Sequence, residues 1–357
     1  MRHPSAQRTG RMHDETRRPS CSGHAAVRLH RVFHVLAIVL GAGLALATVG
    51  AVYQALATER DRKAYPPPGR LVDVGGYRPH LQALGADRGG PTVVLDGGHM
   101  PSPYWGLIQP ELARFTEVVA YDHAGLGWSE PGPQPRDARQ LAAELHALLH
   151  NAGVLGPYVL VGHSDGGLTA RMFAELYADE VAGMALLDAA HEDLFQLAGG
   201  AQTDRTQRVV YGLAPALARV GLFRLLIPGW LMGFEGLPSR PRAELTALAN
   251  QPGQLEIIRD EWQLMEATHA EVRGTRDLGT KPLAVLSATQ WEQTSIPGWA
   301  RLQDALAELS ANSEHTTIGG THGFPADPAY TSQVVETVRR VVEAARTGQP
   351  LARANAN

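Results

Sequence analysis

The sequence predicts an α/β domain with a mostly parallel central sheet covered by helices on both faces, preceded by one transmembrane helix. In the domain, short runs rich in β-branched residues alternate with amphipathic helical patterns. Before the domain, the 27-residue segment Val32–Thr58 contains no Asp, Glu, Lys or Arg. We expect a basic cytoplasmic tail at 1–31, a signal-anchor helix at 32–57, a linker at 58–69 and the domain at 70–350.

The composition excludes several classes of protein. With 44% hydrophobic residues and a formal net charge of −4, the chain is not of the disordered type and offers no general attraction to nucleic acid. Its single cysteine, Cys21, can form neither an intrachain disulfide nor a cysteine-built metal site. We therefore expect no nucleic-acid partner, no metal and no cofactor.

Positive charge is concentrated before the apolar segment. Residues 1–31 contain seven arginines against Asp14 and Glu15, which gives +5 and leaves −9 for the rest of the chain. By the positive-inside rule, this excess predicts a cytoplasmic N-terminus and a domain on the extracytoplasmic side.

Three interpretations of the apolar segment are open. About 20 apolar residues in a helix cross a bilayer, which favours a signal-anchor. A cleaved secretory signal has a shorter apolar region, although Ala55-Leu56-Ala57 is similar to a small-residue cleavage site, and secretion after cleavage is the alternative localisation. A buried core helix would interleave more polar residues.

The domain opens with a hairpin signal, because Arg70–Val74 and Tyr77–Leu84 alternate across Gly75-Gly76. Residues Asp137–Ala152 repeat leucine at helical spacing, with an acidic cap and a stop at Gly153. The β-rich runs predict strands of a parallel sheet: Thr92–Leu95, Val118–Tyr121, Tyr158–Val161, Gly183–Leu187, Leu283–Leu286 and His315–Ile318.

The strongest chemical signal is Gly162-His163-Ser164-Asp165-Gly166, a GxSxG pentapeptide between an apolar strand and a helical pattern. A serine on a sharp strand-to-helix turn has strained backbone angles, and side chains at the flanking glycines would clash. The turn lifts the hydroxyl above the sheet edge, beside the free N–H groups of a helix N-terminus. Ser164 is therefore the predicted nucleophile.

Four motifs in family order make residues 70–345 resemble the α/β-hydrolase superfamily. Besides the GxSxG turn, Leu95-Asp96-Gly97-Gly98-His99 resembles the loop that donates one backbone N–H to the family's oxyanion hole, and Tyr121–Ser129 resembles its D-x-x-G-x-G-x-S turn. Gly320-Thr321-His322-Gly323-Phe324 resembles the catalytic-histidine loop. The resemblance implies an α/β-hydrolase fold and names no substrate.

His322 is the predicted general base. It must lie on a loop at the strand ends near the serine, and the run His315–Ile318 followed by Gly319-Gly320 places it on such a loop. His163 is interpreted as a packing residue. His99 and His123 follow strands, and we expect them to line the pocket in structural or tautomer-fixing roles.

Two carboxylates compete for the third position of the triad. In most of the family the acid follows the seventh strand, where Glu292 is the first acid in this chain. Some branches place the acid after the sixth strand, where Asp188 follows Leu187. We expect Asp188, with Glu292 or a diad without an acid as alternatives.

The oxyanion hole is expected to consist of the backbone N–H groups of Gly98 and Asp165. An acid directly after the nucleophile departs from the family pattern. Pointed into the hole, its carboxylate would repel the developing oxyanion, so we expect the Asp165 side chain to turn outward.

A helical lid is expected at about 192–278, because the minimal fold does not need these residues. Leu213–Leu226 and Leu245–Ala267 have helical spacing. Large apolar side chains are expected to form the roof of the pocket: Leu222, Leu225, Leu226, Trp230 and Trp262.

The predicted function is hydrolysis of an ester or small amide by Ser164 through an acyl-enzyme, with a small-molecule acyl substrate. Ser rather than Asp at the turn argues against epoxide hydrolysis and dehalogenation, which need a carboxylate nucleophile. A cofactor-free haloperoxidase or carbon–carbon bond hydrolase would use the same triad and stays open. So do a non-catalytic hydrolase-fold binding protein and a membrane adaptor.

Overall fold

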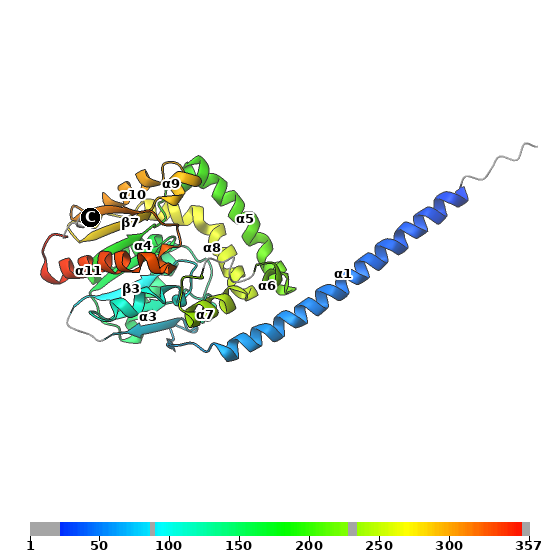
Figure 1. Cartoon of the computed structure of the whole chain (residues 1–357), viewed down its shortest axis with the longest axis horizontal. Coiled ribbons are helices and arrows are strands. Elements are labelled where there is room, and N and C mark those ends of the chain that lie inside the picture. The colour runs from blue at the N-terminus through cyan, green and yellow to red at the C-terminus, as the bar shows by residue number, and fades with distance from the viewer. Residues whose placement is uncertain (1–21, 86–89, 228–233, 352–357) are drawn as a thin grey trace, which may run out of the picture. The chain divides into compact units, whose positions relative to one another are not determined.

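An eight-stranded sheet lies at the centre of the domain (Figure 1). The structure, a computed structural model, describes residues 22–85, 90–227 and 234–351. The strand order is β1-β2-β4-β3-β5-β6-β7-β8, and every pair from β4 to β8 is parallel, whereas β1 and β2 pair antiparallel with their neighbours. The strands are β1 Arg70–Leu71, β2 His80–Leu84, β3 Thr92–Asp96, β4 Val118–Tyr121, β5 Tyr158–His163, β6 Val181–Leu187, β7 Leu283–Ala288 and β8 Ser313–Ile318. This confirms the predicted sheet.

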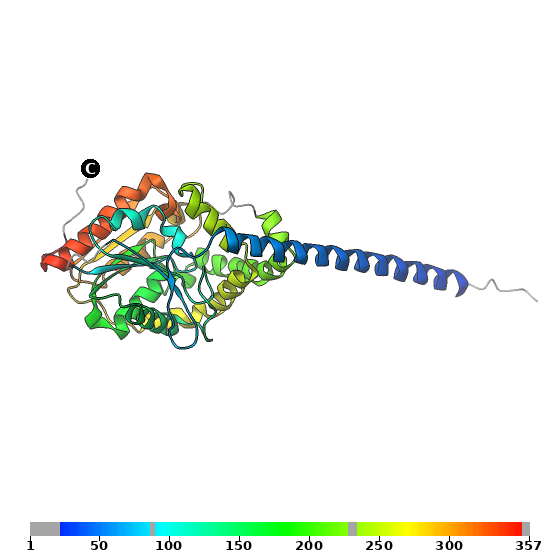
Figure 2. The same cartoon turned by 90° about the horizontal axis from the view of Figure 1, so that it is seen from below.

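Both faces of the sheet are buried. Along β5, Tyr158 and Leu160 belong to one core cluster while Val159 and Val161 belong to another, as the two-residue period of a strand requires. Helices α3 and α4 contribute to the first cluster and α2 and α11 to the second, and Figure 2 shows helices on both sides of the sheet. The helices outside the insertion are α2 Ile108–Leu112, α3 Ala138–Ala152, α4 Gly166–Leu176, α9 Gln290–Thr294, α10 Trp299–Ala307 and α11 Thr331–Thr347.

Helix α3 has the ends that the sequence predicts. The Asp137 carboxylate accepts a hydrogen bond from the Gln140 N–H at 2.9 Å, which satisfies one of the free donors of the first turn. Gly153 ends the helix at φ 67°, a left-handed conformation that glycine adopts at little cost.

The described residues of the insertion between β6 and β7 form four α-helices. They are α5 Ala198–Arg219, α6 Leu222–Leu226, α7 Ser239–Ala249 and α8 Pro252–Arg273. The run of helical spacing over Leu245–Ala267 is divided between α7 and α8, because Pro252 starts a new helix. Its fixed φ suits a first position, and it lacks the N–H that α7 would need to continue. Gly221, at φ 73°, likewise separates α5 from α6.

Helix α1, Ser22–Ala64, is long and apolar enough over Val27–Ala64 to cross a membrane, and its most apolar stretch is not buried, unlike that of a core helix. The chain divides at residue 50 into two units, 1–49 and 50–357. The first part of the expected linker at 58–69 is helical in the structure. The helix ends at Ala64, because Pro66 disfavours helical angles in the residue before it.

Candidate active site

Ser164 stands on a sharp turn between β5 and α4. Its φ of 55° is a left-handed value that non-glycine residues rarely adopt. The neighbouring glycines allow the turn, because a Cβ at Gly162 would lie 2.6 Å from the Cα of Gly167, and a Cβ at Gly166 would overlap the backbone of Asp96. The Ser164 carbonyl accepts from the N–H of Gly167 at 3.1 Å, which secures the turn.

The structure brings Ser164, His322 and Asp188 together from three loops at one edge of the sheet. His322 Nε2 lies 3.1 Å from Ser164 Oγ, and His322 Nδ1 lies 2.7 Å from Asp188 Oδ2. In the tautomer that satisfies both contacts, Nδ1–H donates to the carboxylate and Nε2 accepts from the hydroxyl. The side chains predicted as nucleophile, base and orienting acid are therefore within hydrogen-bonding distance of one another.

Asp188 is fully buried directly after β6, at a φ of 45°. Its Oδ1 accepts hydrogen bonds from the indole N–H of Trp299 at 2.8 Å and from the Ala288 N–H at 3.0 Å. These donors offset the cost of burying the carboxylate and leave Oδ2 for His322.

Glu292, the alternative acid, is used elsewhere. Its carboxylate accepts from the backbone N–H groups of Gly298 and Ala300, at 2.9 and 3.0 Å, at the start of α10. These hydrogen bonds lower the pKa of Glu292. In the structure, Glu292 therefore accepts hydrogen bonds from the loop and first turn at the start of α10.

His163 has a role that the sequence did not reveal. Its Nε2–H donates to the His322 carbonyl at 2.9 Å, and its ring lies 4.7 Å from the His322 ring. Burial, with the nearby His322, lowers the pKa of His163 to about 3, so the ring is neutral and can hold this hydrogen bond. The residue fastens the loop that carries the predicted base, and only the loop's spatial position could have shown this.

The backbone N–H of Gly98, which we expected in the oxyanion hole, is already used in a hydrogen bond. Its N–H donates to the Asp96 carboxylate at 2.8 Å, so it is not a free donor for an oxyanion. Gly98 has a φ of 61° and lies close beneath the Ser164 turn, since a Cβ there would be 2.9 Å from the Gly166 nitrogen. The structure therefore assigns this glycine to close packing of two loops.

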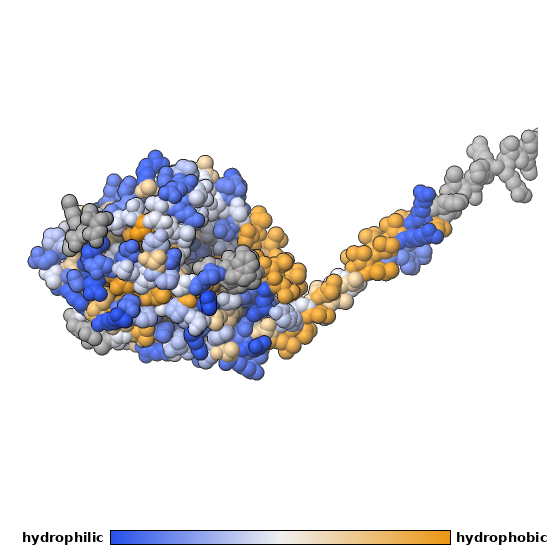
Figure 3. All heavy atoms as spheres, viewed as in Figure 1, coloured by the Kyte–Doolittle hydropathy of each residue, from blue (hydrophilic) through white to orange (hydrophobic). Residues whose placement is uncertain are grey.

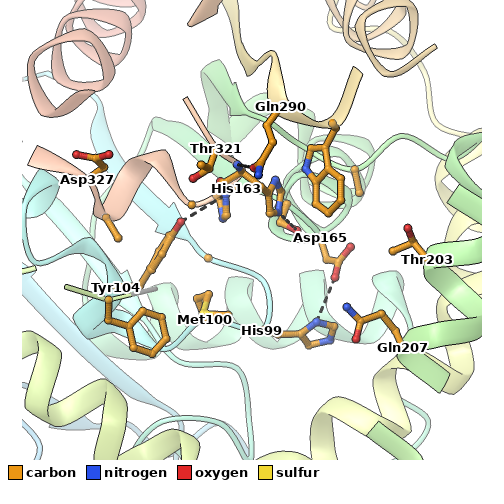
Figure 4. A pocket seen from close by; sticks show the side chains of 18 of the residues that line it. His99, Met100, Tyr104, His163, Asp165, Thr203, Gln207, Gln290, Thr321 and Asp327 are labelled. Carbon is orange, nitrogen blue, oxygen red and sulfur yellow. Dashed lines mark hydrogen bonds and ion pairs between the residues drawn. The ribbon is translucent and has the colours of Figure 1, made fainter. Parts of the chain in front are cut away.

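The Asp165 side chain turns toward His99 (Figure 4). His99 Nδ1 lies 3.1 Å from the Asp165 carboxylate, and His99 Nε2 lies 3.2 Å from the carboxylate of Glu261 on α8. Although burial opposes the charged form, these two carboxylates raise the pKa of His99 to about 9. The His99 ring thus links Asp165, the residue after Ser164, to Glu261 of the insertion.

This contact belongs to a larger buried network of acids and bases. Arg136 Nε donates to Glu261 at 2.7 Å and its other nitrogens bind Glu144, while His123 lies 3.0 Å from Asp96. Burial opposes the charge of His123 as well, and Asp96 with Glu261 raises the pKa of His123 to about 10. The raised pKa values favour positively charged rings at His99 and His123, whereas we expected only structural or tautomer-fixing roles for these residues.

Ser164 and His322 line a cavity of about 1000 Å³, large enough for a small molecule. Figure 4 shows Thr203 and Gln207 of α5 on one side of it and Asp327 and Tyr104 on the other. Trp262 lines the cavity as expected, whereas Leu222, Leu225 and Leu226 do not: they are exposed on the outer surface. Trp230 lies outside the described residues.

Within the described ranges, no group of three or more His, Cys, Asp or Glu side chains is arranged to hold a metal ion. The arrangement can support nucleophilic catalysis, because the Ser164 hydroxyl lines the cavity within hydrogen-bonding distance of His322, which in turn contacts Asp188. A site of this kind at the carboxyl ends of the strands of a mostly parallel sheet is typical of the α/β-hydrolase fold.

Comparison with known proteins agrees with that fold. Residues 89–227 match the family described as alpha/beta hydrolase fold, and the sheet and its helices have the α/β-hydrolase fold. A solved structure of a thermophilic esterase from Thermogutta terrifontis is similar, with a TM-score of 0.56, 22% identity and coverage of 78% of this chain and 98% of that chain.

Curated relatives are matched over part of their length only. The chain is 33% identical over 115 residues to a soluble epoxide hydrolase of Corynebacterium sp., which covers 32% of this chain and 39% of the relative. It is 30% identical over 109 residues to a vacuolar membrane protein of Saccharomyces cerevisiae, covering 29% and 17% respectively. For three further relatives the chain spans between 18% and 42% of their length.

Proposed function

We propose that the chain is a membrane-anchored serine hydrolase that cleaves an ester or small amide through an acyl-enzyme. The observation that carries the proposal is the position of His322, with one ring nitrogen 3.1 Å from Ser164 Oγ and the other 2.7 Å from Asp188. A serine nucleophile favours acyl transfer over epoxide opening, although an epoxide hydrolase is among the relatives.

In the first half of the reaction, Ser164 Oγ forms a bond to the acyl carbon while its proton passes to His322 Nε2. As the bond to the leaving group breaks, the departing alcohol or amine takes that proton. Asp188 holds the imidazole in the required tautomer and stabilises the imidazolium.

In the second half, a water molecule gives a proton to His322 and attacks the acyl-enzyme. The acid leaves as Ser164 Oγ regains the proton. We propose the Asp165 N–H as one oxyanion donor, because it lies at the start of α4 beside the nucleophile. The Gly98 N–H can be the second donor only if it leaves Asp96.

The proposed localisation is a single-pass membrane protein with a cytoplasmic N-terminus and the hydrolase on the extracytoplasmic side. Its support is the length and apolarity of α1 and the arginine excess before it. Secretion after cleavage near residue 58 is the alternative.

The proposal is tested with the full chain and a panel of p-nitrophenyl esters, with styrene oxide as the epoxide comparator. We expect ester hydrolysis that Ser164→Ala abolishes and that Ser295→Ala, a change at an exposed position, leaves unchanged. Turnover of the epoxide without turnover of any ester would contradict acyl transfer.

A further inference from the structure

Exposed apolar side chains gather on one face of the unit that begins at Gly50. Among the described residues of this unit, nine of the ten exposed large apolar side chains lie on the end of α1, on α5 or on α6, and the tenth is Leu155. Figure 3 shows the apolar side chains gathered over α5 and α6. We name six of them the α5–α6 apolar face, with exposed fractions of 42% to 66%: Val209, Val210, Leu213, Leu222, Leu225 and Leu226.

The core of the unit does not use this face. On α5 the opposite side packs on α8 through Ala214, Ala218 and Leu255. The same stripe of α5, nearer the start of the helix, lines the active-site cavity with Thr203, Gln207 and Tyr211. The apolar face is therefore a second surface of the helix that covers the cavity, left in contact with solvent.

The end of α1 is held against the junction of α5 and α6. Gly50 packs so closely on Val220 that a Cβ would overlap the carbonyl of that residue, and a Cβ at Gly221 would lie 3.1 Å from the Tyr53 ring. Further along α1, Gln54 Nε2 donates to the Asn250 carbonyl at 2.8 Å. These contacts lie within the unit that starts at Gly50.

Helix α1 also exposes apolar side chains in the part that lies within this unit. Val52 and Leu56 of α1 are 56% and 67% exposed, and they belong to the stretch that is long and apolar enough to cross a membrane.

We propose that the α5–α6 apolar face rests on the lipid bilayer in which α1 is embedded. The proposal rests on the membrane anchoring proposed above. Helices that present leucine and valine on one side and polar residues on the other lie in the interface with the apolar side among the acyl chains. The roof of the active-site cavity then lies at the membrane surface, where the face of α5 opposite the bilayer meets substrate.

The test uses the full chain with Cys21→Ser, so that one introduced cysteine can carry an environment-sensitive fluorophore. Leu225→Cys places the probe on the α5–α6 apolar face, and Leu155→Cys, which is 70% exposed outside it, is the matched control. Both proteins are reconstituted in phosphatidylcholine vesicles with and without doxyl-labelled acyl chains. We expect a blue shift and quenching by doxyl lipid at position 225 and neither at position 155.

Three other outcomes overturn the proposal. A probe at position 225 that behaves as in water, in a chain that floats with vesicles after alkaline carbonate, removes the bilayer contact and leaves the anchoring intact. A blue shift without doxyl quenching, together with cross-linking between two copies at position 225, assigns the face to a second copy. A chain that fails to float removes both the anchoring and this inference. Because none of these readouts needs turnover, they stand apart from the ester assay.

Discussion

At the scale of single residues, the surroundings of Asp188 support its proposed role as the acid partner of His322. Its φ of 45° turns the side chain back toward the sheet edge, where Trp299 and Ala288 bind one carboxylate oxygen and His322 the other. A left-handed conformation at a non-glycine residue is costly and persists only where its surroundings hold it. The hydrogen bonds to one carboxylate supply that restraint.

We predict that Asp188→Asn leaves the fold intact and lowers ester turnover by about 10⁴-fold, as the corresponding change does in serine proteases. The amide can stabilise the wrong imidazole tautomer and cannot balance the imidazolium charge. Steady-state kinetics with a p-nitrophenyl ester measures the effect. Glu292→Gln is the matched control and should change turnover little, because Glu292 binds the start of α10. The assignment fails if the two variants exchange these effects.

The residues of the proposed triad could be predicted from the sequence, whereas the residues that support them by hydrogen bonds could not. Motifs reveal Ser164 and His322 because the turn chemistry around them is local. The support from Trp299 and His163 depends on segments brought together only by the folded sheet. Gly98 was predicted as an oxyanion donor because its local motif fits that role. The local sequence does not reveal that the Gly98 N–H donates to the Asp96 carboxylate.

At the scale of elements, helix α8 is tied to the Ser164 turn by charge. Glu261 on α8 binds His99, and His99 binds Asp165 at the start of α4. Since each His99 nitrogen faces a carboxylate, the bridge is favourable with the ring charged. Stability that comes from a raised pKa is fully present below the unfolded value of 6.5 and is lost as the pH rises through the folded value of about 9.

We therefore predict that His99→Gln lowers the free energy of unfolding most near pH 6, by up to about 3 kcal/mol, and progressively less toward pH 10. Denaturant unfolding of the purified chain at several pH values measures the difference. His150→Gln, at an exposed position on α3, is the control. A deficit that does not change with pH would show that the His99 charge contributes nothing to the bridge.

The strands and helix α3 could be predicted from the sequence, whereas the bounds of the helices in the insertion could not. The central strands β3 to β7 are mostly apolar because both of their faces are buried, and α3 carries its own start and stop signals. In the insertion, helical spacing continues across Asn250, so the boundary depends on the proline that follows. The spacing also could not tell that α6 contributes no residue to the cavity lining and that its leucines are exposed.

At the scale of the whole molecule, the orientation of α1 decides where the hydrolase acts. With a cytoplasmic N-terminus, we predict that protease added to intact cells, stripped of any outer membrane, digests the hydrolase domain. Immunodetection of the domain before and after lysis measures this. Protection until lysis would reverse the orientation, and a soluble mature form that begins near residue 58 would indicate signal cleavage.

The central claim is that Ser164 is an activated nucleophile at the end of the sheet. The most direct measurement is reaction of the full chain with a fluorophosphonate, followed by peptide mass spectrometry. We predict one adduct on the peptide that contains Ser164, absent from Ser164→Ala and unchanged in Ser295→Ala. A folded protein that forms no adduct, or an adduct of equal yield in Ser164→Ala, would contradict the claim.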